Sequence, residues 1–293
     1  MTHPPRKTLN LIGAGRVGQT LARLLNAHGV FEIQDVYSRS AGGATAATAF
    51  IGAGRAVDAL TALRPADICL LTVPDTRIAE IAGQLAAQCR TNASAAAPQT
   101  APSAFHCSGF LSAGAALGPL SASGWQVASM HPILSFASPE SAVAQFPGTP
   151  CGIEGDAPLT RILTEAAAAI GGRPFAIDSD AKPLYHAAAV FESNFMPALH
   201  DVATRLWQTA GVPPDIVDAL AQGMLRRQVD NILNLGARAA LTGPASRGDR
   251  AVVDAQHAAV ARWDAAAGDA YAALSHLIDT IRPRPTGDAD TAR

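Results

Sequence analysis

Short apolar runs alternate with helical patterns along the first part of the chain. Residues 8–12 and 68–73 are almost continuously apolar, as is typical of parallel strands that are covered on both faces. Between them, residues 17–25 carry apolar side chains at i, i+4, i+7 and i+8, the spacing of an amphipathic helix. This alternation predicts an α/β fold with a doubly wound, mostly parallel sheet.

The same pattern continues up to Asp178 and then changes. Further apolar segments predict strands at residues 33–37, 104–107, 127–130, 150–154 and 174–177. Beyond Asp178 only helical periodicity remains, which predicts a second, all-α domain. We therefore expect an α/β domain over residues 1–178, an all-α domain for substrate binding and dimerisation over 179–286, and a disordered tail over 287–293.

Composition narrows the classes of partner. The chain has 293 residues, 48% of them hydrophobic, and a net charge of −2 without a basic block, which argues against a nucleic-acid partner. No apolar run approaches the ~20 residues of a membrane span, and no apolar segment follows the N-terminus, so we expect a cytoplasmic protein without a membrane partner. The four cysteines lack metal-ligand spacing, so we expect no metal.

A glycine loop, Gly13-Ala14-Gly15-Arg16-Val17-Gly18, joins the first strand to the first helix. In a dinucleotide site the first glycine permits a tight turn, the second lets the backbone approach a pyrophosphate, and the third allows close helix–strand packing. The helix N-terminus then offers amide groups to the phosphates. This context predicts a Rossmann-type nucleotide site at Gly13, Gly15, Arg16, Val17 and Gly18, with a ligand-free glycine turn as the alternative.

The residues after the second strand bear on which nucleotide binds. An NAD enzyme usually has Asp or Glu here for the ribose 2′-hydroxyl. This chain has Ser38-Arg39-Ser40, whose hydroxyls and guanidinium suit a 2′-phosphate. The segment therefore favours NADP over NAD, although an exposed arginine in a turn would give the same pattern.

Several longer segments resemble known families. LNLIGAGRVGQTLARLL and LLTVPDTRIAEIA resemble pyrroline-5-carboxylate reductases and the wider 6-phosphogluconate and 3-hydroxyacid dehydrogenase superfamily. FHCSGFLSAGAAL, SMHPILSF, KPLYHAAAVFESNF and LTGPASRGD resemble a narrower group of bacterial two-domain Rossmann-like proteins whose helical domain has no known function. The resemblance implies a helical C-terminal domain that builds a homodimer, with the active site between the domains. It also implies that Val73, Pro74 and Asp75 lie near the ribose and nicotinamide.

Lys182 is a candidate for proton transfer. It is one of only two lysines in the chain, so its persistence where arginine is the common cation is informative. Related hydroxyacid dehydrogenases carry a catalytic lysine on the corresponding helix, with an asparagine four residues later; here that position is His186. A Lys182–His186 pair would depress the pKa of both groups. Ser193 and Asn194 follow near the same helix face and are candidate substrate contacts. A solvated lysine and an interface histidine remain the alternatives.

Ser108 and His131 form a second candidate group, since both follow strands whose carboxyl ends should face the cofactor. Ser129-Met130-His131-Pro132 resembles the His-Pro motif of prephenate dehydrogenases, in which the histidine polarises the substrate hydroxyl and bonds to a serine on the preceding loop. That resemblance implies a catalytic His131 and a substrate-binding Ser108. A histidine that merely caps a strand end is the alternative.

The polar loop from Thr242 to Asp249 supplies Arg247, either as a substrate contact or as part of an ordinary helix cap with Asp249 as N-cap. Together these features predict an NADP-dependent oxidoreductase that transfers hydride to or from a small carbonyl, imine or hydroxyl substrate. A non-catalytic NADP-binding sensor or scaffold is the alternative, and a deazaflavin-dependent relative is a third possibility.

Overall fold

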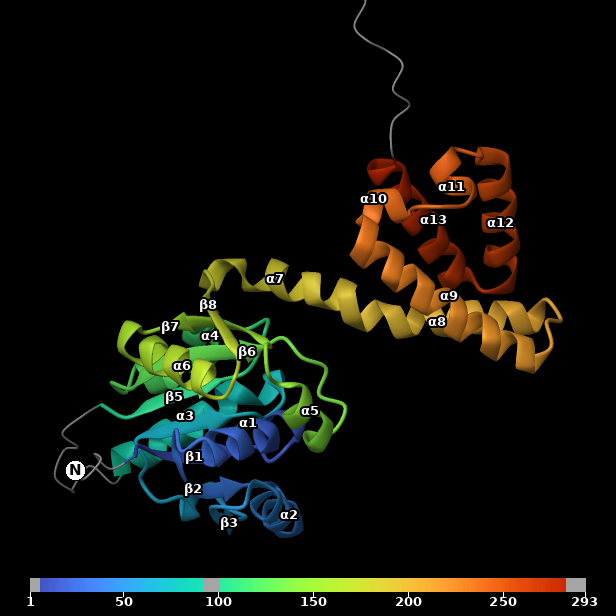
Figure 1. The fold of residues 1–293 in the computed structure, drawn as a ribbon. Helices are drawn as coiled ribbons and strands as arrows, with labels where there is room; N and C mark the ends of the chain where they lie inside the picture. Colours follow the sequence, from blue (N-terminus) through green and yellow to red (C-terminus); the bar gives the residue numbers. More distant parts are fainter. Residues whose placement is uncertain (1–5, 92–100, 283–293) are drawn as a thin grey trace, which may run out of the picture. The chain divides into compact units, whose positions relative to one another are not determined.

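The computed structural model describes residues 6–91 and 101–282, which divide into two compact units, residues up to Ser193 and residues from Asn194 (Figure 1). The first unit contains β1 (Thr8–Ile12), α1 (Arg16–Ala27), β2 (Glu32–Tyr37), α2 (Ala41–Ile51), β3 (Arg55–Val57), η1 (Leu60–Ala62), β4 (Ile68–Leu71), α3 (Asp75–Thr91), β5 (Ser103–His106), α4 (Ala113–Ser121), β6 (Gln126–Pro132), α5 (Pro139–Gln145), β7 (Pro150–Gly155), α6 (Ala157–Ala169), β8 (Arg173–Ala176), η2 (Ser179–Ala181), α7 (Lys182–Ala189) and the π-helical η3 (Val190–Asn194), whose last residue belongs to the second unit.

One sheet of eight strands, in the order β3-β2-β1-β4-β5-β6-β7-β8, forms the frame of this unit. All neighbouring strands are parallel except β6 and β7, which pair antiparallel. The predicted doubly wound, mostly parallel α/β fold is confirmed. The predicted strands all appear within one or two residues of their expected bounds. Two helices, α4 and α5, were not predicted, because their alanine-rich and short sequences carry no clear apolar periodicity.

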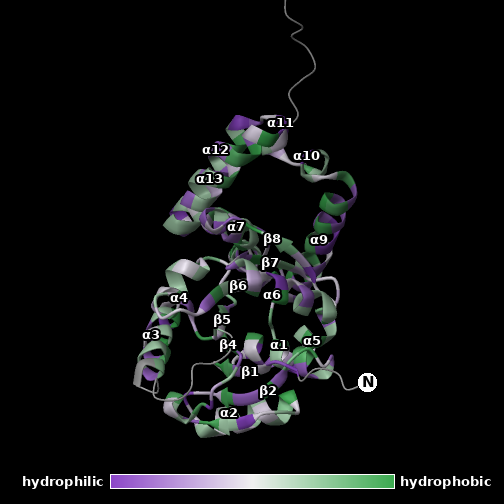
Figure 2. Cartoon of the chain, turned by 90° about the vertical axis from the view of Figure 1, so that its left-hand side faces the viewer, coloured by the Kyte–Doolittle hydropathy of each residue, from purple (hydrophilic) through white to green (hydrophobic). Residues whose placement is uncertain are grey.

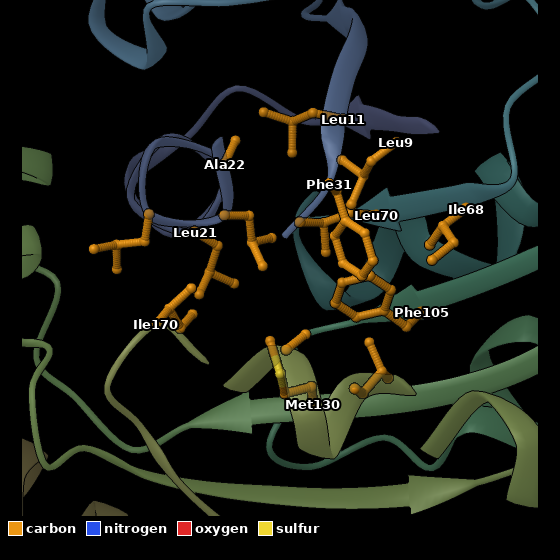
Figure 3. Packing of buried hydrophobic residues seen from close by; sticks show 14 of the residues in the cluster. Leu9, Leu11, Leu21, Ala22, Phe31, Ile68, Leu70, Phe105, Met130 and Ile170 are labelled. Carbon is orange, nitrogen blue, oxygen red and sulfur yellow. The ribbon is translucent and has the colours of Figure 1, made fainter. Parts of the chain in front are cut away.

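The central strands are buried on both faces. Leu9, Leu11 and Leu70 point into one core cluster, where Figure 3 shows them beside Leu21 of α1 and Phe105 of β5. Ile12, Cys69 and Leu71, at alternate positions of the same strands, belong to a second cluster with residues of α3 and α4. This two-sided burial explains why the strand sequences are continuously apolar.

The second unit consists of helices: α8 (Phe195–Thr209), α9 (Pro214–Leu235), α10 (Ala237–Ala240), α11 (Pro244–Arg247), α12 (Arg250–Trp263) and α13 (Ala265–Ile281). The strands end near Asp178, as expected, but α7 belongs to the first unit, because its first side chain, Lys182, is buried among residues of that unit. None of the helices that the structure describes is long and apolar enough to cross a membrane. The tail predicted at 287–293 lies outside the described residues.

Candidate functional site

The glycine loop between β1 and α1 has the geometry of a nucleotide cradle. Gly13 has a φ of +102°, which a side chain would strain, and a Cβ there would lie 2.8 Å from the Thr72 backbone. A Cβ on Gly18 would overlap the Thr72 hydroxyl and the Gly13 carbonyl oxygen. A Cβ on Gly15, in contrast, would have no atom within 4 Å. The loop is therefore packed tightly at both ends and open in the middle, where a pyrophosphate would need room.

The N-terminus of α1 leaves its first amides available. Gly15 is the N-cap residue and provides no side-chain acceptor. Arg16 begins the helix, and its guanidinium donates a 3.4 Å hydrogen bond to the Phe136 carbonyl oxygen. Val17 is half-buried and packs against the core. Uncapped amides at a helix N-terminus attract an anion, so this end of α1 fits a phosphate group.

Two serines flank Arg39 at the end of β2. Ser40 caps α2 by accepting a 3.2 Å hydrogen bond from the Gly43 amide. A Cβ on Gly43 would lie 2.9 Å from both the Ser38 and the Ser40 hydroxyl oxygens, so these two hydroxyls gather at one helix N-terminus. Arg39 is exposed, and within the described part of the chain no carboxylate pairs with it. Its guanidinium is thus free to meet an anionic ligand.

Asp75 links the end of β4 to the loop after β5. It is exposed, follows Val73 and Pro74 directly, and accepts a 2.7 Å hydrogen bond from the Ser108 hydroxyl. The same Ser108 oxygen accepts hydrogen bonds from the backbone amides of Phe110 and Leu111. Ser108 is buried, and its hydroxyl is fully engaged. Its contacts therefore organise the loop rather than leave a group open to a substrate.

A cluster of three aromatic side chains forms around His131 at the end of β6. The Nδ1 atom of His131 lies 2.8 Å from the Tyr185 hydroxyl oxygen. The ring of His186 meets that of His131 edge to face, with centroids 5.8 Å apart. All three side chains are half-buried. The resemblance to prephenate dehydrogenases implied a bond from His131 to Ser108; the structure instead pairs Nδ1 of His131 with Tyr185.

Two glycines make room for this cluster. A Cβ on Gly109 would lie 2.7 Å from Cε1 and 2.9 Å from Nε2 of His131, and would overlap the ring of His186. Gly152 faces His131 across the antiparallel β6–β7 pair, and a Cβ there would lie 2.9 Å from the Tyr185 hydroxyl oxygen. Because neither position carries a side chain, the tyrosine and both imidazoles can meet.

Burial controls the ionisation of the cluster. Burial is the largest cause, and electrostatic interactions with His186 and Lys182 add to it; together they lower the pKa of His131 to about 4, so the imidazole is neutral at pH 7. Burial raises the pKa of Tyr185 to about 12, so the phenol keeps its proton. In one tautomer the phenol donates to Nδ1 and Nε2 carries a proton; in the other, Nδ1 donates and the phenol proton is free. Either way, one proton has no hydrogen-bond partner among residues 6–91 and 101–282, which leaves it for a ligand.

Behind this cluster lies a buried ion pair. The ammonium of Lys182 lies 3.5 Å from Oε1 of Glu154, and both side chains are almost fully buried. Burial lowers the pKa of Lys182, and this effect outweighs the interaction with Glu154, which raises it. Burial raises the pKa of Glu154, but hydrogen bonds from Ser129, Ser179 and the Ala113 amide outweigh that effect and lower it. Lys182 and His186 thus do not pair with each other, since the lysine turns inward and the histidine toward His131.

The remaining predicted substrate contacts are at the end of the first unit and in the second unit. Ser193 is exposed, and its hydroxyl donates a 2.6 Å hydrogen bond to the carbonyl oxygen of Ala189, the last residue of α7. Asn194 and Arg247 belong to the second unit. The Arg247 guanidinium forms a 3.1 Å ion pair with Asp249, which occupies the N-cap position of α12 without capping it through its side chain. These three residues therefore stay predictions as substrate contacts.

Sequence reasoning did not select Tyr185, Glu154 or Ser129. Tyr185 is next to His186 and three residues after Lys182, so the helical spacing could have found it. Ser129 lies two residues before His131 and therefore on the same face of β6. Glu154 lies opposite Ser129 only because β7 runs antiparallel to β6, and an apolar run does not reveal its direction in a sheet. The described residues contain no group of His, Cys, Asp or Glu that could hold a metal ion.

Comparison with known proteins adds two family matches. Residues 8–96 match the family described as NADP oxidoreductase coenzyme F420-dependent, and residues 149–278 match a domain of unknown function, DUF2520. No curated protein matches significantly.

Solved structures resemble most of the chain. A candidate NADP oxidoreductase from Bacteroides fragilis is 23% identical, with a TM-score of 0.72, over 94% of this chain and 98% of the other. A protein from Thermotoga maritima is 28% identical, with a TM-score of 0.69 and the same coverage. A pyrroline-5-carboxylate reductase from Coxiella burnetii is 13% identical, with a TM-score of 0.54, over 93% and 98%. The chain thus carries a segment that matches the model of the NADP oxidoreductase coenzyme F420-dependent family, followed by a segment that matches the DUF2520 model and begins within the first unit.

Proposed function

We propose that the protein is an NADP-dependent oxidoreductase that transfers hydride to or from a small carbonyl, imine or hydroxyl substrate. One observation carries the proposal: an open glycine cradle after β1 and a histidine–tyrosine pair with a free proton at the end of β6 lie at the same edge of one sheet. The carboxyl edge of a parallel sheet is where such folds bind nucleotides and substrates. Hydride transfer needs an oriented cofactor and one proton donor or acceptor; this edge would have a place for the first, and the His131–Tyr185 pair would provide the second.

The residues present fit the cofactor. Gly13, Gly15 and Gly18, with the amides of Arg16 and Val17, would hold the pyrophosphate. Ser38, Arg39 and Ser40 would hold the 2′-phosphate, while Val73, Pro74 and Asp75 would follow the ribose toward the nicotinamide. When bound, the nicotinamide supplies or accepts the hydride.

The polar cluster would act on the substrate. His131 and Tyr185 would present their one free proton to the substrate oxygen or nitrogen and thereby polarise its double bond. His186 would border the same place. Asp75, through Ser108, would hold the loop that carries Gly109 against the cluster. Ser193, Asn194 and Arg247 remain predictions as further substrate contacts.

We also propose a homodimer through the helical unit. Helix α9 exposes large apolar side chains along its length: Ile216, Met224, Leu225, Val229, Ile232, Leu233 and Leu235. In Figure 2 the ribbon of α9 carries both hydrophobic and hydrophilic colours. Monomeric proteins rarely expose so many apolar side chains on one helix. Light scattering of the purified chain tests this directly, because a monomer at micromolar concentration would contradict it.

Titrations with NADPH and NADH test the nucleotide. We expect NADPH to bind more tightly, and Arg39→Ala to weaken NADPH roughly 10- to 100-fold while leaving NADH nearly unchanged, since a charge-assisted bond to the 2′-phosphate is lost. Arg161→Ala, which removes an exposed arginine of α6, is the matched control. Equal losses for both nucleotides in Arg39→Ala would reject the 2′-phosphate role. Turnover is then sought with small carbonyls, imines and alcohols, through the change in nicotinamide absorbance.

The matched family favours a second candidate, hydride exchange between NADP and a deazaflavin, because its description names coenzyme F420. Adding a deazaflavin to the NADPH-loaded protein separates the candidates: bleaching of the deazaflavin supports this one, and turnover of a carbonyl or imine supports the first. Tight NADPH binding with neither reaction would favour the sensor or scaffold alternative.

A further inference from the structure

Lys182 has no proton to offer a ligand. Its side chain is 1% exposed. Its ammonium donates to the Ser108 carbonyl oxygen at 2.9 Å and to the Ser129 hydroxyl at 2.6 Å, and pairs with Glu154 at 3.5 Å. An ammonium has three donor protons, and three protein acceptors surround this one. The geometry therefore does not match a lysine that hands a proton to a substrate.

Glu154 connects the lysine to further elements. Its Oε1 accepts hydrogen bonds from the Ser129 hydroxyl at 2.6 Å and from the Ala113 amide, at the start of α4, at 2.8 Å. Its Oε2 accepts a 2.7 Å hydrogen bond from the Ser179 hydroxyl in η2. Each oxygen of this buried carboxylate thus has a partner. The ion pair and its hydrogen bonds join β6, β7, α4, η2, α7 and the loop after β5.

These elements are the ones that carry the polar cluster. Ser129 is two residues before His131, on the same face of β6. Ser108 precedes Gly109, whose Cα packs against the rings of His131 and His186. Lys182 is three and four residues before Tyr185 and His186, so anchoring it sets the rotation of the first turn of α7. A shift of any of these segments would separate Tyr185 from His131.

We propose that Lys182 and Glu154 are a neutral pair of positioning residues, which hold His131, Tyr185 and His186 in contact, and that Lys182 takes no part in proton transfer. The proposal rests on the proposed function for its meaning in catalysis, but the positioning itself concerns only the fold of the first unit. A buried pair suits this role because its two charges cancel, while its hydrogen bonds specify one arrangement of several segments.

A double-mutant cycle of Lys182→Met and Glu154→Gln tests it. Each single variant leaves one buried charge unpaired, and we expect its melting temperature to fall by about 10 °C. The double variant removes both charges at similar volume, and we expect most of that loss to be recovered. Lys7→Met and Glu165→Gln, which remove an exposed lysine and an exposed glutamate, are the matched controls.

Turnover, once a substrate is in hand, separates positioning from chemistry. We expect the turnover of Lys182→Met to fall roughly 100-fold, the loss that a displacement of about 1 Å would cause. The turnover of the double variant should return to within roughly tenfold of the parent. A double variant that regains its melting temperature but stays as slow as Lys182→Met would overturn the proposal, since the lysine would then act chemically. If Lys182→Met does not fold, the double variant is compared with Glu154→Gln instead.

Histidine NMR decides the question even without a substrate. With ¹³C-labelled histidine rings, the His131 signal is assigned by its loss in His131→Gln. Tyr185→Phe should shift that signal in the parent protein, because the phenol bonds to Nδ1. We expect this shift to vanish in the Lys182→Met background and to return in the double variant. A shift of equal size in all three backgrounds would show that the pair does not position the cluster, whatever reaction the protein catalyses.

Discussion

Replacement of Gly109 by alanine tests the polar cluster most directly. The added methyl group would lie 2.7 Å from Cε1 and 2.9 Å from Nε2 of His131, and would overlap Cδ2 of His186. Neither ring can turn away freely. Nδ1 of His131 is bonded to Tyr185, and both rings are half-buried. The change adds one methyl group without touching a charge or a hydrogen bond.

The size of the effect follows from the overlap. Carbon atoms in contact stay ~3.5 Å apart, so Cε1 must retreat by about 0.8 Å. Overpacking of this kind costs about 1–3 kcal/mol of folding free energy. A displacement near 1 Å at a reacting group costs turnover roughly 100-fold. The glycine cradle after β1 is not touched by the new methyl group, so NADPH affinity should stay within about twofold of the parent.

Three measurements of Gly109→Ala complete the test: urea unfolding, NADPH titration, and turnover once a substrate is identified. The control is Gly83→Ala in the middle of α3, where a Cβ would have no atom within 4 Å. That change should stabilise the protein by about 0.5–1 kcal/mol through helix propensity. If Gly109→Ala shifts the ring NMR signals of His131 and His186 but keeps parental turnover, the His131 cluster is not the reacting site.

Two further predictions concern stability. Asp35 is buried between Arg55 and Arg64. Burial raises the pKa of Asp35, but the hydrogen bonds from both guanidiniums outweigh that effect and lower it from 3.8 to about 2. The carboxylate should therefore contribute about 2 kcal/mol of stability above pH ~4, and this contribution should be lost as the pH falls toward 2. Urea unfolding of Asp35→Ala at pH 7 should show a loss of about that size, whereas the exposed Asp58→Ala should not. Burial is the main reason that the pKa values of His106 and His131 are lowered to about 4. Below pH 6.5 the unfolded chain therefore binds protons at these histidines that the folded chain does not bind. The stability of the protein should decline from about pH 6.5 toward 4. Replacing His131 by glutamine should flatten that decline in thermal unfolding and His28→Gln should not; equal slopes in all three proteins would contradict the assignment.

Much of the glycine loop and of the strands around it could be predicted from local sequence. Gly13 and Gly18 lack side chains because the turn and the helix packing leave no room, and such constraints act over a few residues in a fixed strand–turn–helix context. The Ser38-Arg39-Ser40 segment follows a strand whose end the apolar pattern already located. The predicted roles of Ser108 and Lys182 were less secure, because a residue type and a position along a helix do not say whether a side chain turns toward a ligand or inward.

By itself, then, the sequence determined the α/β architecture, located the glycine loop that we propose as a dinucleotide cradle, and supplied some of the residues able to carry chemistry. Periodicity and glycine spacing encode these features locally, so no knowledge of distant contacts is needed. Only the tertiary structure decided which candidates meet. It turned Lys182 toward Glu154, which lies on β7, a strand whose antiparallel direction cannot be inferred from its apolar sequence. It also brought Tyr185 to His131 across the space left by Gly152. Such contacts join residues tens of positions apart, and they exist only once the sheet has formed.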